Sequence, residues 1–330
     1  MTALLEIQDL VVEFSTGGQA LRAVNAVSYD VEPGEIVAVV GESGSGKSVT
    51  ALSVLRLVPQ PPGRIVSGEI RFQGTDLLSL DDEAIRQVRG GQIGMVFQEP
   101  MTSLNPVLSI GRQMTEAMRL HLGLSAAAAR ARAAELLTMV GIADPESRLK
   151  AYPHHLSGGM RQRVMIAMAL SCNPPLIIAD EPTTALDVTI QAQILELMRD
   201  LCRRLGVALV IITHNLAVVA RYADRVNVMY AGSVVERGQA REIYRRPSHP
   251  YTVGLMNSVP RLDRPRGAPL EPIPGSPPDL ASLPPGCAFQ PRCHMATARC
   301  LAEPPTLTPV AADHWSACFE SQRVAGELVR

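Results

Sequence analysis

One glycine-rich octapeptide limits the folds open to this chain more than any other feature. Residues 41–48 read Gly-Glu-Ser-Gly-Ser-Gly-Lys-Ser and fit the pattern G-x-x-x-x-G-K-[ST]. The octapeptide follows a continuous apolar run, residues 36–40, and precedes residues 48–58, whose apolar positions recur at helical spacing. A strand, a phosphate-binding loop and a helix in this order predict an α/β nucleotide-binding fold.

The chemistry of such a loop explains its residue types. Glycines let backbone N–H groups converge on phosphate oxygens, and the helix N-terminus adds a favourable dipole. Lys47 would neutralise charge on the β- and γ-phosphates, and the Ser48 hydroxyl would ligate Mg²⁺. The only lysines are Lys47 and Lys150, so composition alone would produce this match in roughly one chain in a thousand.

Two further apolar runs end in polar residues. Residues 176–179 are followed by Asp180 and Glu181, and residues 207–213 are followed by His214. In open α/β sheets, groups just past the carboxyl ends of buried strands lie where ligands bind. Asp180 would orient Mg²⁺ through its water shell, and Glu181 would polarise the water that attacks the γ-phosphate.

The remaining secondary structure is expected to place these strands in a sheet covered by helices. Residues 4–14 and 20–31 alternate apolar and polar positions and predict strands. Residues 125–140 are rich in helix formers, and residues 190–205 also predict a helix. Buried strands that alternate with helices indicate a largely parallel α/β sheet.

Composition excludes several classes of protein. With 46% hydrophobic residues the 330-residue chain can build a core, and its formal net charge of −1 argues against the basic face that nucleic acid requires. Its longest apolar runs are strand-sized and fall short of the roughly 18–20 residues of a membrane span. The N-terminus lacks a basic region followed by an apolar stretch, so we expect no secretory signal.

The segment before Asp180 resembles a family signature. Residues 156–163 read Leu-Ser-Gly-Gly-Met-Arg-Gln-Arg, which resembles the signature sequence of ATP-binding-cassette (ABC) ATPases. Gln98 resembles the Q-loop glutamine of that family, residues 185–187 resemble its D-loop, and His214 resembles its switch histidine. Asn215 departs from the pattern, because many members carry an acidic residue there. We expect this change to alter a neighbouring contact without abolishing hydrolysis.

The resemblance implies an α/β P-loop NTPase fold of the ABC ATPase type, with a mixed sheet core, an antiparallel β subdomain and a helical subdomain. It implies an ATPase domain over residues 1–255, with the helical subdomain at about 100–172, and a small irregular C-terminal domain over 256–330. The implied catalytic residues are Glu181, His214 and Gln98, and the implied Mg²⁺ ligands are Ser48, Gln98 and Asp180. The implied ATP-binding residues are Phe14, Gly41, Ser43, Gly44, Gly46, Lys47, Ser48, Val49, Ser157, Gly158 and Gly159.

A finer resemblance extends over nearly the whole chain. Residues 101–106 (Met-Thr-Ser-Leu-Asn-Pro), residues 246–252 (Arg-Pro-Ser-His-Pro-Tyr-Thr) and the tail resemble the ATPase subunits of dipeptide and oligopeptide importers. This implies four partners: two membrane-spanning permease subunits, a second ATPase subunit and an extracytoplasmic peptide-binding protein. The chain would attach through them to the cytoplasmic face of the cell (inner) membrane. The family's head-to-tail dimer closes the signature of one subunit over the ATP of the other, and residues 98–110 would help receive a permease coupling helix.

Two other functions stay open. Nickel or other small-solute importers have similar ATPases, although nickel importers usually lack so long a tail. A soluble, non-transport ABC ATPase is an alternative of a different class. Those that act on ribosomes usually carry two cassettes, whereas this chain has one phosphate loop. DNA-repair cassettes insert long coiled coils, for which the roughly 60 residues between Gln98 and Ser157 leave no room.

The tail carries a second candidate site. Cys287, Cys293, Cys300 and Cys318 lie in a stretch that also holds many of the prolines. Four thiolates can complete an iron–sulfur cluster, and some of the peptide-importer ATPases that this tail resembles carry a 4Fe–4S cluster there. Zinc, joined by His294 or His314, and unligated thiols are the alternatives, although the absence of a C-x-x-C pair weakens the zinc interpretation.

Overall fold

The structure, a computed structural model, describes residues 3–184, 186–219, 221–258 and 272–327. The chain forms two compact units, each assembled from segments that are distant in sequence. The first unit contains residues 1–4, 31–36 and 73–212, and the second contains residues 5–30, 37–72 and 213–330.

The first unit contains a parallel three-stranded array. In this array β6 (Ile93–Val96) pairs with β7 (Leu176–Asp180), which pairs in turn with β8 (Ala208–Thr213). Every residue of β7 and β8 is buried, as the continuous apolar runs predict. The other elements of this unit are β5 (Thr75–Asp76), α2 (Asp82–Val88), α3 (Pro100–Ser103), α4 (Ile110–His121), α5 (Ala126–Met139), α6 (Pro145–Lys150), η1 (Pro153–His155), α7 (Gly158–Ala169) and α8 (Val188–Leu205).

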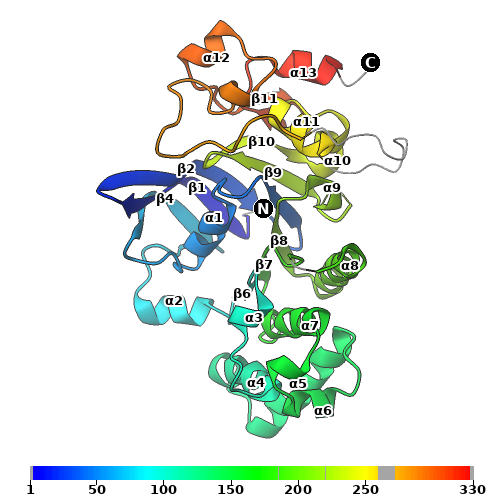
Figure 1. Ribbon diagram of the computed structural model, residues 1–330. Coiled ribbons are helices and arrows are strands. Elements are labelled where there is room, and N and C mark those ends of the chain that lie inside the picture. The colour runs from blue at the N-terminus through cyan, green and yellow to red at the C-terminus, as the bar shows by residue number, and fades with distance from the viewer. Residues whose placement is uncertain (1–2, 185, 220, 259–271, 328–330) are drawn as a thin grey trace. The chain divides into compact units, whose positions relative to one another are not determined.

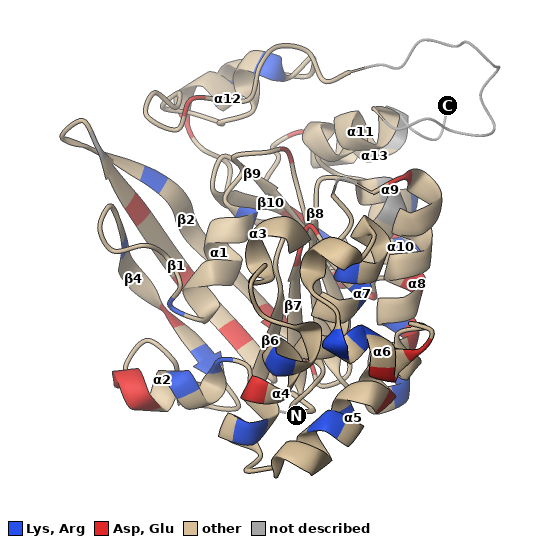
Figure 2. Cartoon of the chain, turned by 60° about the horizontal axis from the view of Figure 1, so that its bottom comes forward, with Lys and Arg blue, Asp and Glu red and all other residues tan. Residues whose placement is uncertain are grey.

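Helices α4 to α7 pack together into a helical layer of this unit (Figure 1). Ser125 caps α5, because its hydroxyl accepts a hydrogen bond from the backbone N–H of Ala128. Arg130 of α5 and Glu146 of α6 form an ion pair with a closest N–O distance of 2.6 Å. Charges of both signs are interspersed on α5 and α6 (Figure 2).

The second unit contains two groups of strands. In one, β1 (Leu5–Thr16) lies between β2 (Gln19–Val31) and β4 (Gly63–Phe72), and its pairing with β4 is antiparallel from Leu5–Phe72 to Phe14–Gly63. In the other, the order is β11 (Thr308–Ala311), β12 (His314–Ser316), β10 (Ser233–Gln239), β9 (Arg225–Tyr230) and β3 (Ile36–Val40). Because β3 and β9 are parallel and β9 and β10 antiparallel, the predicted mixed sheet is confirmed.

The helices of the second unit flank these strands (Figure 1). They are α1 (Lys47–Val54), α9 (Leu216–Val219), α10 (Ala240–Arg245), α11 (Pro250–Asn257), η2 (Gln290–Arg292), α12 (Ala298–Ala302) and α13 (Ser321–Glu327). Strands β11 and β12 come from the C-terminal tail and extend the sheet through β10, with Glu236 opposite Ser316.

A buried carboxylate fixes the tail beside the start of α11. Glu236 is fully buried and accepts hydrogen bonds from the backbone N–H groups of Ser248 (2.6 Å) and His249 (3.1 Å). Its Oε1 also lies 2.7 Å from Nε2 of His314 on β12. This network, buried and hydrogen-bonded, places His249 and the chain around it at a defined position.

The predicted helices differ from the observed ones mainly at their ends. The helix expected over 48–58 ends at Val54, because Arg56 takes a left-handed backbone conformation (φ 51°) and Pro59 follows. The helix expected from residue 190 begins at Val188, because Asp187 caps it. Among the described residues, no helix has both the length and the apolar character that a membrane crossing needs.

Candidate functional site

The phosphate loop lies in the second unit, between β3 and α1. Lys47 is buried, and its ammonium donates hydrogen bonds to the carbonyl oxygens of Gly41 and Glu42 (both 2.8 Å) and to Oγ of Ser45 (3.2 Å). These bonds hold the positive charge within the loop. The first turn of α1 carries no acidic side chain, so nothing there opposes an anion.

Two glycines of the loop approach other backbone closely. A Cβ added at Gly41 would lie 2.2 Å from the carbonyl oxygen of Met229, and one added at Gly46 would lie 2.5 Å from that of Ala23. Gly46 also has a φ of +96°, which favours glycine. These positions therefore require glycine for packing as well as for the shape of the loop.

The other predicted ATP-binding residues of this unit have distinct surroundings. Ser43 and Gly44 are exposed on the loop, whereas Ser48 and Val49 are half-buried on α1. Phe14 is half-buried at the end of β1, paired with Gly63.

The first unit holds the predicted catalytic carboxylate at the end of β7. Glu181 accepts hydrogen bonds at Oε2 from Nε2 of Gln98 (3.0 Å) and from Oγ1 of Thr184 (2.8 Å). Its backbone N–H donates to the carbonyl oxygen of Ile212 (2.9 Å), and its φ of 44° lies in the left-handed region. A left-handed non-glycine residue costs roughly 1–3 kcal/mol and is typical of functional sites. The preceding Asp180 is buried.

The sequence indicated Gln98 and Glu181 separately, and the structure joins them. Thr184 was missed, although a threonine three residues after a carboxylate at a strand end is the kind of donor that can orient it. His214 is exposed; it comes directly after β8 and belongs to the second unit. Of the predicted D-loop, Asp187 caps α8 by accepting a hydrogen bond from the backbone N–H of Ile190 (3.0 Å), and Ala185 lies outside the described residues.

The predicted signature begins helix α7. Ser157 is its N-cap, and the hydroxyl accepts a hydrogen bond from the backbone N–H of Met160 (3.3 Å). Gly158 is exposed and Gly159 half-buried in the first turn, which carries no acidic side chain. The start of this twelve-residue helix can therefore present backbone N–H groups to an anion.

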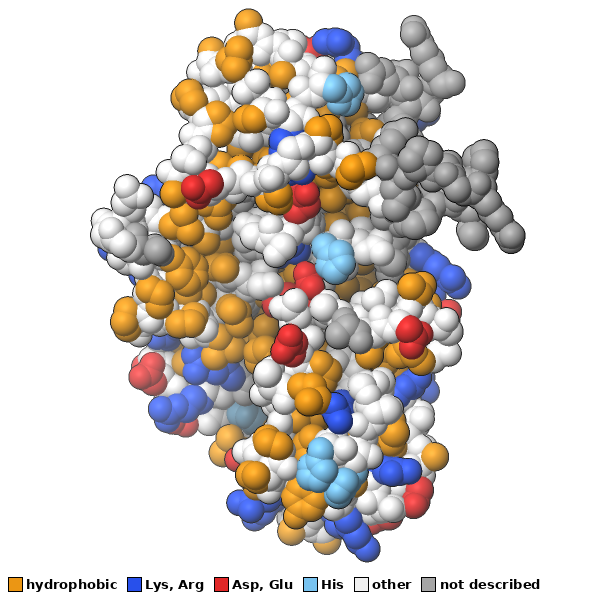
Figure 3. Space-filling model, viewed as in Figure 1, with side chains coloured by type: hydrophobic (Ala, Val, Ile, Leu, Met, Phe, Trp, Pro, Cys, Tyr) orange, Lys and Arg blue, Asp and Glu red, His pale blue; other side chains and the backbone are white. Residues whose placement is uncertain are grey.

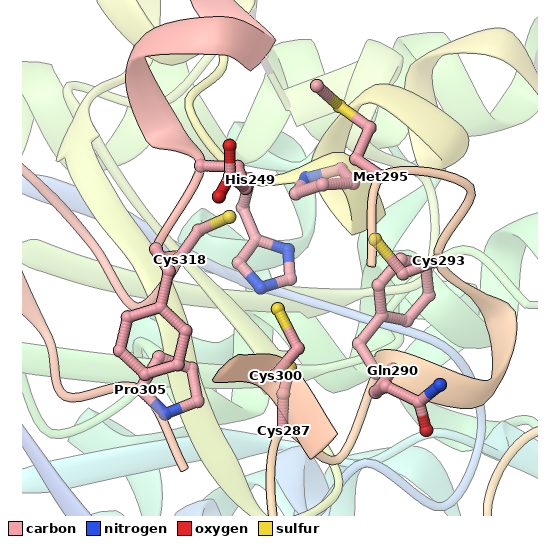
Figure 4. Close-up of a pocket in the computed structure, with 12 residues that line it drawn as sticks. His249, Cys287, Gln290, Cys293, Met295, Cys300, Pro305 and Cys318 are labelled. Carbon is pink, nitrogen blue, oxygen red and sulfur yellow. The ribbon is translucent and has the colours of Figure 1, made fainter. Parts of the chain in front are cut away.

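Four cysteines in the C-terminal segment line one cavity, which we call the cysteine pocket: Cys287, Cys293, Cys300 and Cys318. Cys293 and Cys318 point their sulfur atoms towards this cavity from opposite sides (Figure 4). Burial raises the pKa of Cys287, Cys293 and Cys318, that of Cys318 to about 12. These three thiols are therefore protonated at neutral pH.

The histidines proposed for a zinc site lie elsewhere. His314 is bonded to Glu236, and His294 is exposed; neither lines the cysteine pocket. His249, which belongs to the motif at residues 246–252 and was not expected near the cysteines, lines it instead, and burial lowers its pKa to about 3, so the imidazole is neutral at pH 7. Across the described parts of the chain, no three His, Cys, Asp or Glu side chains are arranged to hold a metal ion.

Two family models match the chain. The model described as ABC transporter matches residues 24–184, and the model described as oligopeptide/dipeptide transporter, C-terminal region, matches residues 235–300. The second match includes Cys287, Cys293 and Cys300 of the cysteine pocket.

Comparison with individual proteins gives the same grouping. The oligopeptide transport ATP-binding protein OppD of Bacillus subtilis is 51% identical over 96% of this chain and 88% of its own length. OppD of Mycobacterium bovis is 52% identical over 99% of this chain, which spans only 53% of that relative's length. A dimeric post-hydrolysis structure of the ATP-binding cassette MJ0796 with ADP and phosphate matches with a TM-score of 0.65 and 29% identity, over 72% of this chain and 99% of that one.

Proposed function

Because this chain belongs to the ABC transporter family of ATP-binding proteins, we propose that it is the ATP-hydrolysing subunit of a dipeptide or oligopeptide importer. The observation that carries the proposal is the Glu181 carboxylate, oriented by Gln98 and Thr184, in a chain that also has a complete phosphate loop. The name of the Bacillus relative and the match to the peptide-transporter C-terminal region support the choice of substrate.

The roles of the residues follow from their chemistry. Glu181 acts as the general base for the attacking water, and its two donors fix the direction of the carboxylate, as proton transfer requires. Lys47 balances the charge of the β- and γ-phosphates, and the backbone N–H groups of the loop and of α1 bind their oxygens. His214 contacts the γ-phosphate and helps to hold the water.

The donor atoms assigned to Mg²⁺ suit that ion. Ser48, Asp180 and Gln98 offer a hydroxyl, a carboxylate and an amide oxygen, and Mg²⁺ prefers oxygen ligands. The amide nitrogen of Gln98 is used by Glu181, so its oxygen is the atom that would serve as the ligand. Bound Mg²⁺ would supply positive charge that stabilises the phosphates during transfer.

Pairing with a second ATPase subunit would complete each ATP site. The start of α7, with Ser157, Gly158 and Gly159, belongs to a different compact unit from the phosphate loop and offers N–H groups for a nucleotide held by the other subunit. The dimeric state of the MJ0796 cassette supports this arrangement.

An exposed apolar surface supports attachment to the permease subunits. Around α3, Phe97, Met101 and Val107 are 40%, 68% and 76% exposed, and Figure 3 shows hydrophobic side chains at this surface. Exposed apolar side chains that gather on one surface indicate a protein–protein contact. The chain would thus lie at the cytoplasmic face of the membrane, next to two permease subunits and served by an extracytoplasmic peptide-binding protein.

We expect the chain to consist of two functional domains. Residues 1–255 would form the ATPase domain, with the helical subdomain at about 100–172, and residues 256–330 the C-terminal domain. The family match over residues 235–300 begins before this boundary, on β10, the strand that β12 joins.

The cysteine pocket would hold a 4Fe–4S cluster. Such a cluster takes four cysteine thiolates, and four cysteines line this one cavity; binding of iron would displace their thiol protons. Zinc suits the pocket less well, because Zn–S bonds of about 2.3 Å would bring the four sulfur atoms within about 4 Å of one another. Among the described residues, no three cysteines lie close enough together to bind one such ion.

Reconstitution of the whole complex tests the proposed function. The chain should copurify with its permease partners, and in vesicles its ATP hydrolysis should rise when the peptide-binding protein is added with a peptide. Hydrolysis that ignores both permease and peptide would contradict the transport role. A complex that hydrolyses no ATP would contradict the proposal altogether.

A further inference from the structure

The second residue of the phosphate loop is bound by an arginine from the C-terminal segment, 250 residues away in sequence. Nη1 of Arg292 donates to Oε2 of Glu42 (2.6 Å), and Nη2 donates to Oε1 (3.0 Å). The pair is bidentate, and the Arg292 side chain is only 5% exposed. Glu42 occupies a variable position of the pattern G-x-x-x-x-G-K-[ST], and Arg292 belongs to no nucleotide-binding motif.

Other contacts hold Arg292 in this position. Its Nε donates to the carbonyl oxygen of Pro274 (2.8 Å), and its guanidinium carbon lies about 6 Å from the ring centres of Tyr230 and Phe289. The hydrogen bonds to Glu42 raise the pKa of Arg292, so the guanidinium remains charged. A buried arginine with this many fixed contacts is preorganised to hold a carboxylate.

The same region also binds the backbone of the loop. The N–H of Glu42 donates to the hydroxyl oxygen of Tyr251 (2.7 Å), and Tyr251 packs on Tyr230 with ring centres 4.6 Å apart. Beside the loop, a small cavity lies between loop residues such as Glu42 and Ser43 and the C-terminal residues Pro277, Pro278 and Leu280. The C-terminal segment thus contacts the loop through the Arg292 side chain and along a cavity wall, and Tyr251 of α11 holds the backbone of the loop beside these contacts.

The charge of Glu42 explains why these contacts matter for function. Its carbonyl oxygen accepts a hydrogen bond from Lys47, so this acidic residue belongs to the loop expected to receive a triphosphate. A carboxylate without a partner would repel that anion and would be free to turn towards it. Held by Arg292, it is neutralised and fixed in direction.

We propose that Arg292 is a positioning residue of the nucleotide site: it holds and neutralises Glu42 so that the phosphate loop can accept ATP. The C-terminal segment is then part of the ATP site. This inference rests on the proposed ATPase function and adds a residue that no nucleotide motif contains.

Binding of a fluorescent ATP analogue to the purified full-length chain tests the proposal. Arg292→Met should weaken binding by roughly five- to twentyfold and raise the KM for ATP, with kcat changed by no more than about twofold. In Arg292→Met the unpaired Glu42 carboxylate repels the phosphates of ATP, and salt screens this repulsion. The loss of ATP affinity should therefore become smaller as the ionic strength rises.

A second change separates this role from simple packing. Glu42→Gln in the Arg292→Met background removes the repelling carboxylate and should return affinity to within about threefold of Glu42→Gln alone. A purely structural role for Arg292 predicts no such rescue. Arg299→Met is the matched control, because Arg299 pairs with Glu303 in the same segment and both side chains are exposed.

The affinities of these variants for ATP test the role of Arg292 directly. Equal affinities for Arg292→Met and Arg299→Met, or additive losses in the double variant, would overturn the role of Arg292. If Arg292→Met fails to fold, Arg292→Lys should bind ATP more weakly than wild type and recover with Glu42→Gln; failure to do so also overturns it. A wild-type chain that does not bind ATP would instead refute the proposed function.

Discussion

Gln98 and Glu181 are 83 residues apart in sequence, yet the amide nitrogen of Gln98 donates a 3.0 Å hydrogen bond to Oε2 of Glu181. The bond links the end of β7 to the segment that follows β6, and these two strands pair in parallel. Gln98, which resembles the Q-loop glutamine, therefore holds the carboxylate that we propose activates water.

Removing the charge of that carboxylate should separate ATP binding from hydrolysis. Glu181→Gln should lower kcat by roughly 10²–10⁴, because the proposed general base is lost. ATP binding should be retained, and the closed dimer should accumulate with ATP in size-exclusion chromatography. Glu196→Gln, at a half-buried position on α8 that pairs with Arg199, is the control. Normal turnover in Glu181→Gln would disprove the assignment.

The Thr184 hydroxyl should contribute through Glu181. Thr184→Val keeps the shape of the side chain but removes the 2.8 Å hydrogen bond to Oε2. We expect kcat to fall roughly three- to tenfold with an unchanged KM for ATP, because only the direction of the carboxylate is loosened. Thr184→Ser keeps the hydroxyl and should hydrolyse ATP at close to the wild-type rate. Equal rates for the valine and serine variants would argue against this orienting role.

Local sequence signals predicted much of the fold. The apolar runs became β3, β7 and β8, and Ser125 and Asp187 cap helices close to the expected starts. Buried strands and helix caps depend on residues within a few positions of one another, so the local sequence is enough to predict them.

The missing parts of the site depend on contacts between distant segments. Arg292 binds Glu42 across 250 residues, and no periodicity or motif connects the two. The position of His314 near the cysteines in sequence makes it a candidate zinc ligand. The pairing of β12 with β10 instead puts it against the fully buried Glu236. Tertiary packing decides which residue Arg292 or His314 contacts, and the pattern of residues along the chain does not show that packing.

The close packing of the phosphate loop predicts a severe effect of one added methyl group. In Gly41→Ala the new Cβ would lie 2.2 Å from the carbonyl oxygen of Met229, so the loop or β9 must shift. We expect the free energy of unfolding to drop by about 1–3 kcal/mol and ATP affinity to fall at least tenfold. Urea titration and binding of a fluorescent ATP analogue measure the two effects.

Gly158→Ala is the matched control for stability. Its added Cβ would meet Leu186 at 3.6 Å, an ordinary contact, so the free energy of unfolding should change by less than about 1 kcal/mol. If Gly41→Ala were as stable as this control and bound ATP normally, the tight fit of the loop against β9 would be contradicted.

The cysteine pocket gives a prediction about metal content. Protein purified without oxygen should contain about four irons per chain and the same number of inorganic sulfides, with visible absorption that disappears on oxidation. Cys318→Ser should lose most of this iron, because it removes one of the four thiols around the cavity. Cys202→Ser, at a buried cysteine of α8 in the other compact unit, should keep the iron. Stoichiometric zinc, or no metal in anaerobically purified wild-type protein, would reject the cluster and leave the pocket as packed, protonated thiols.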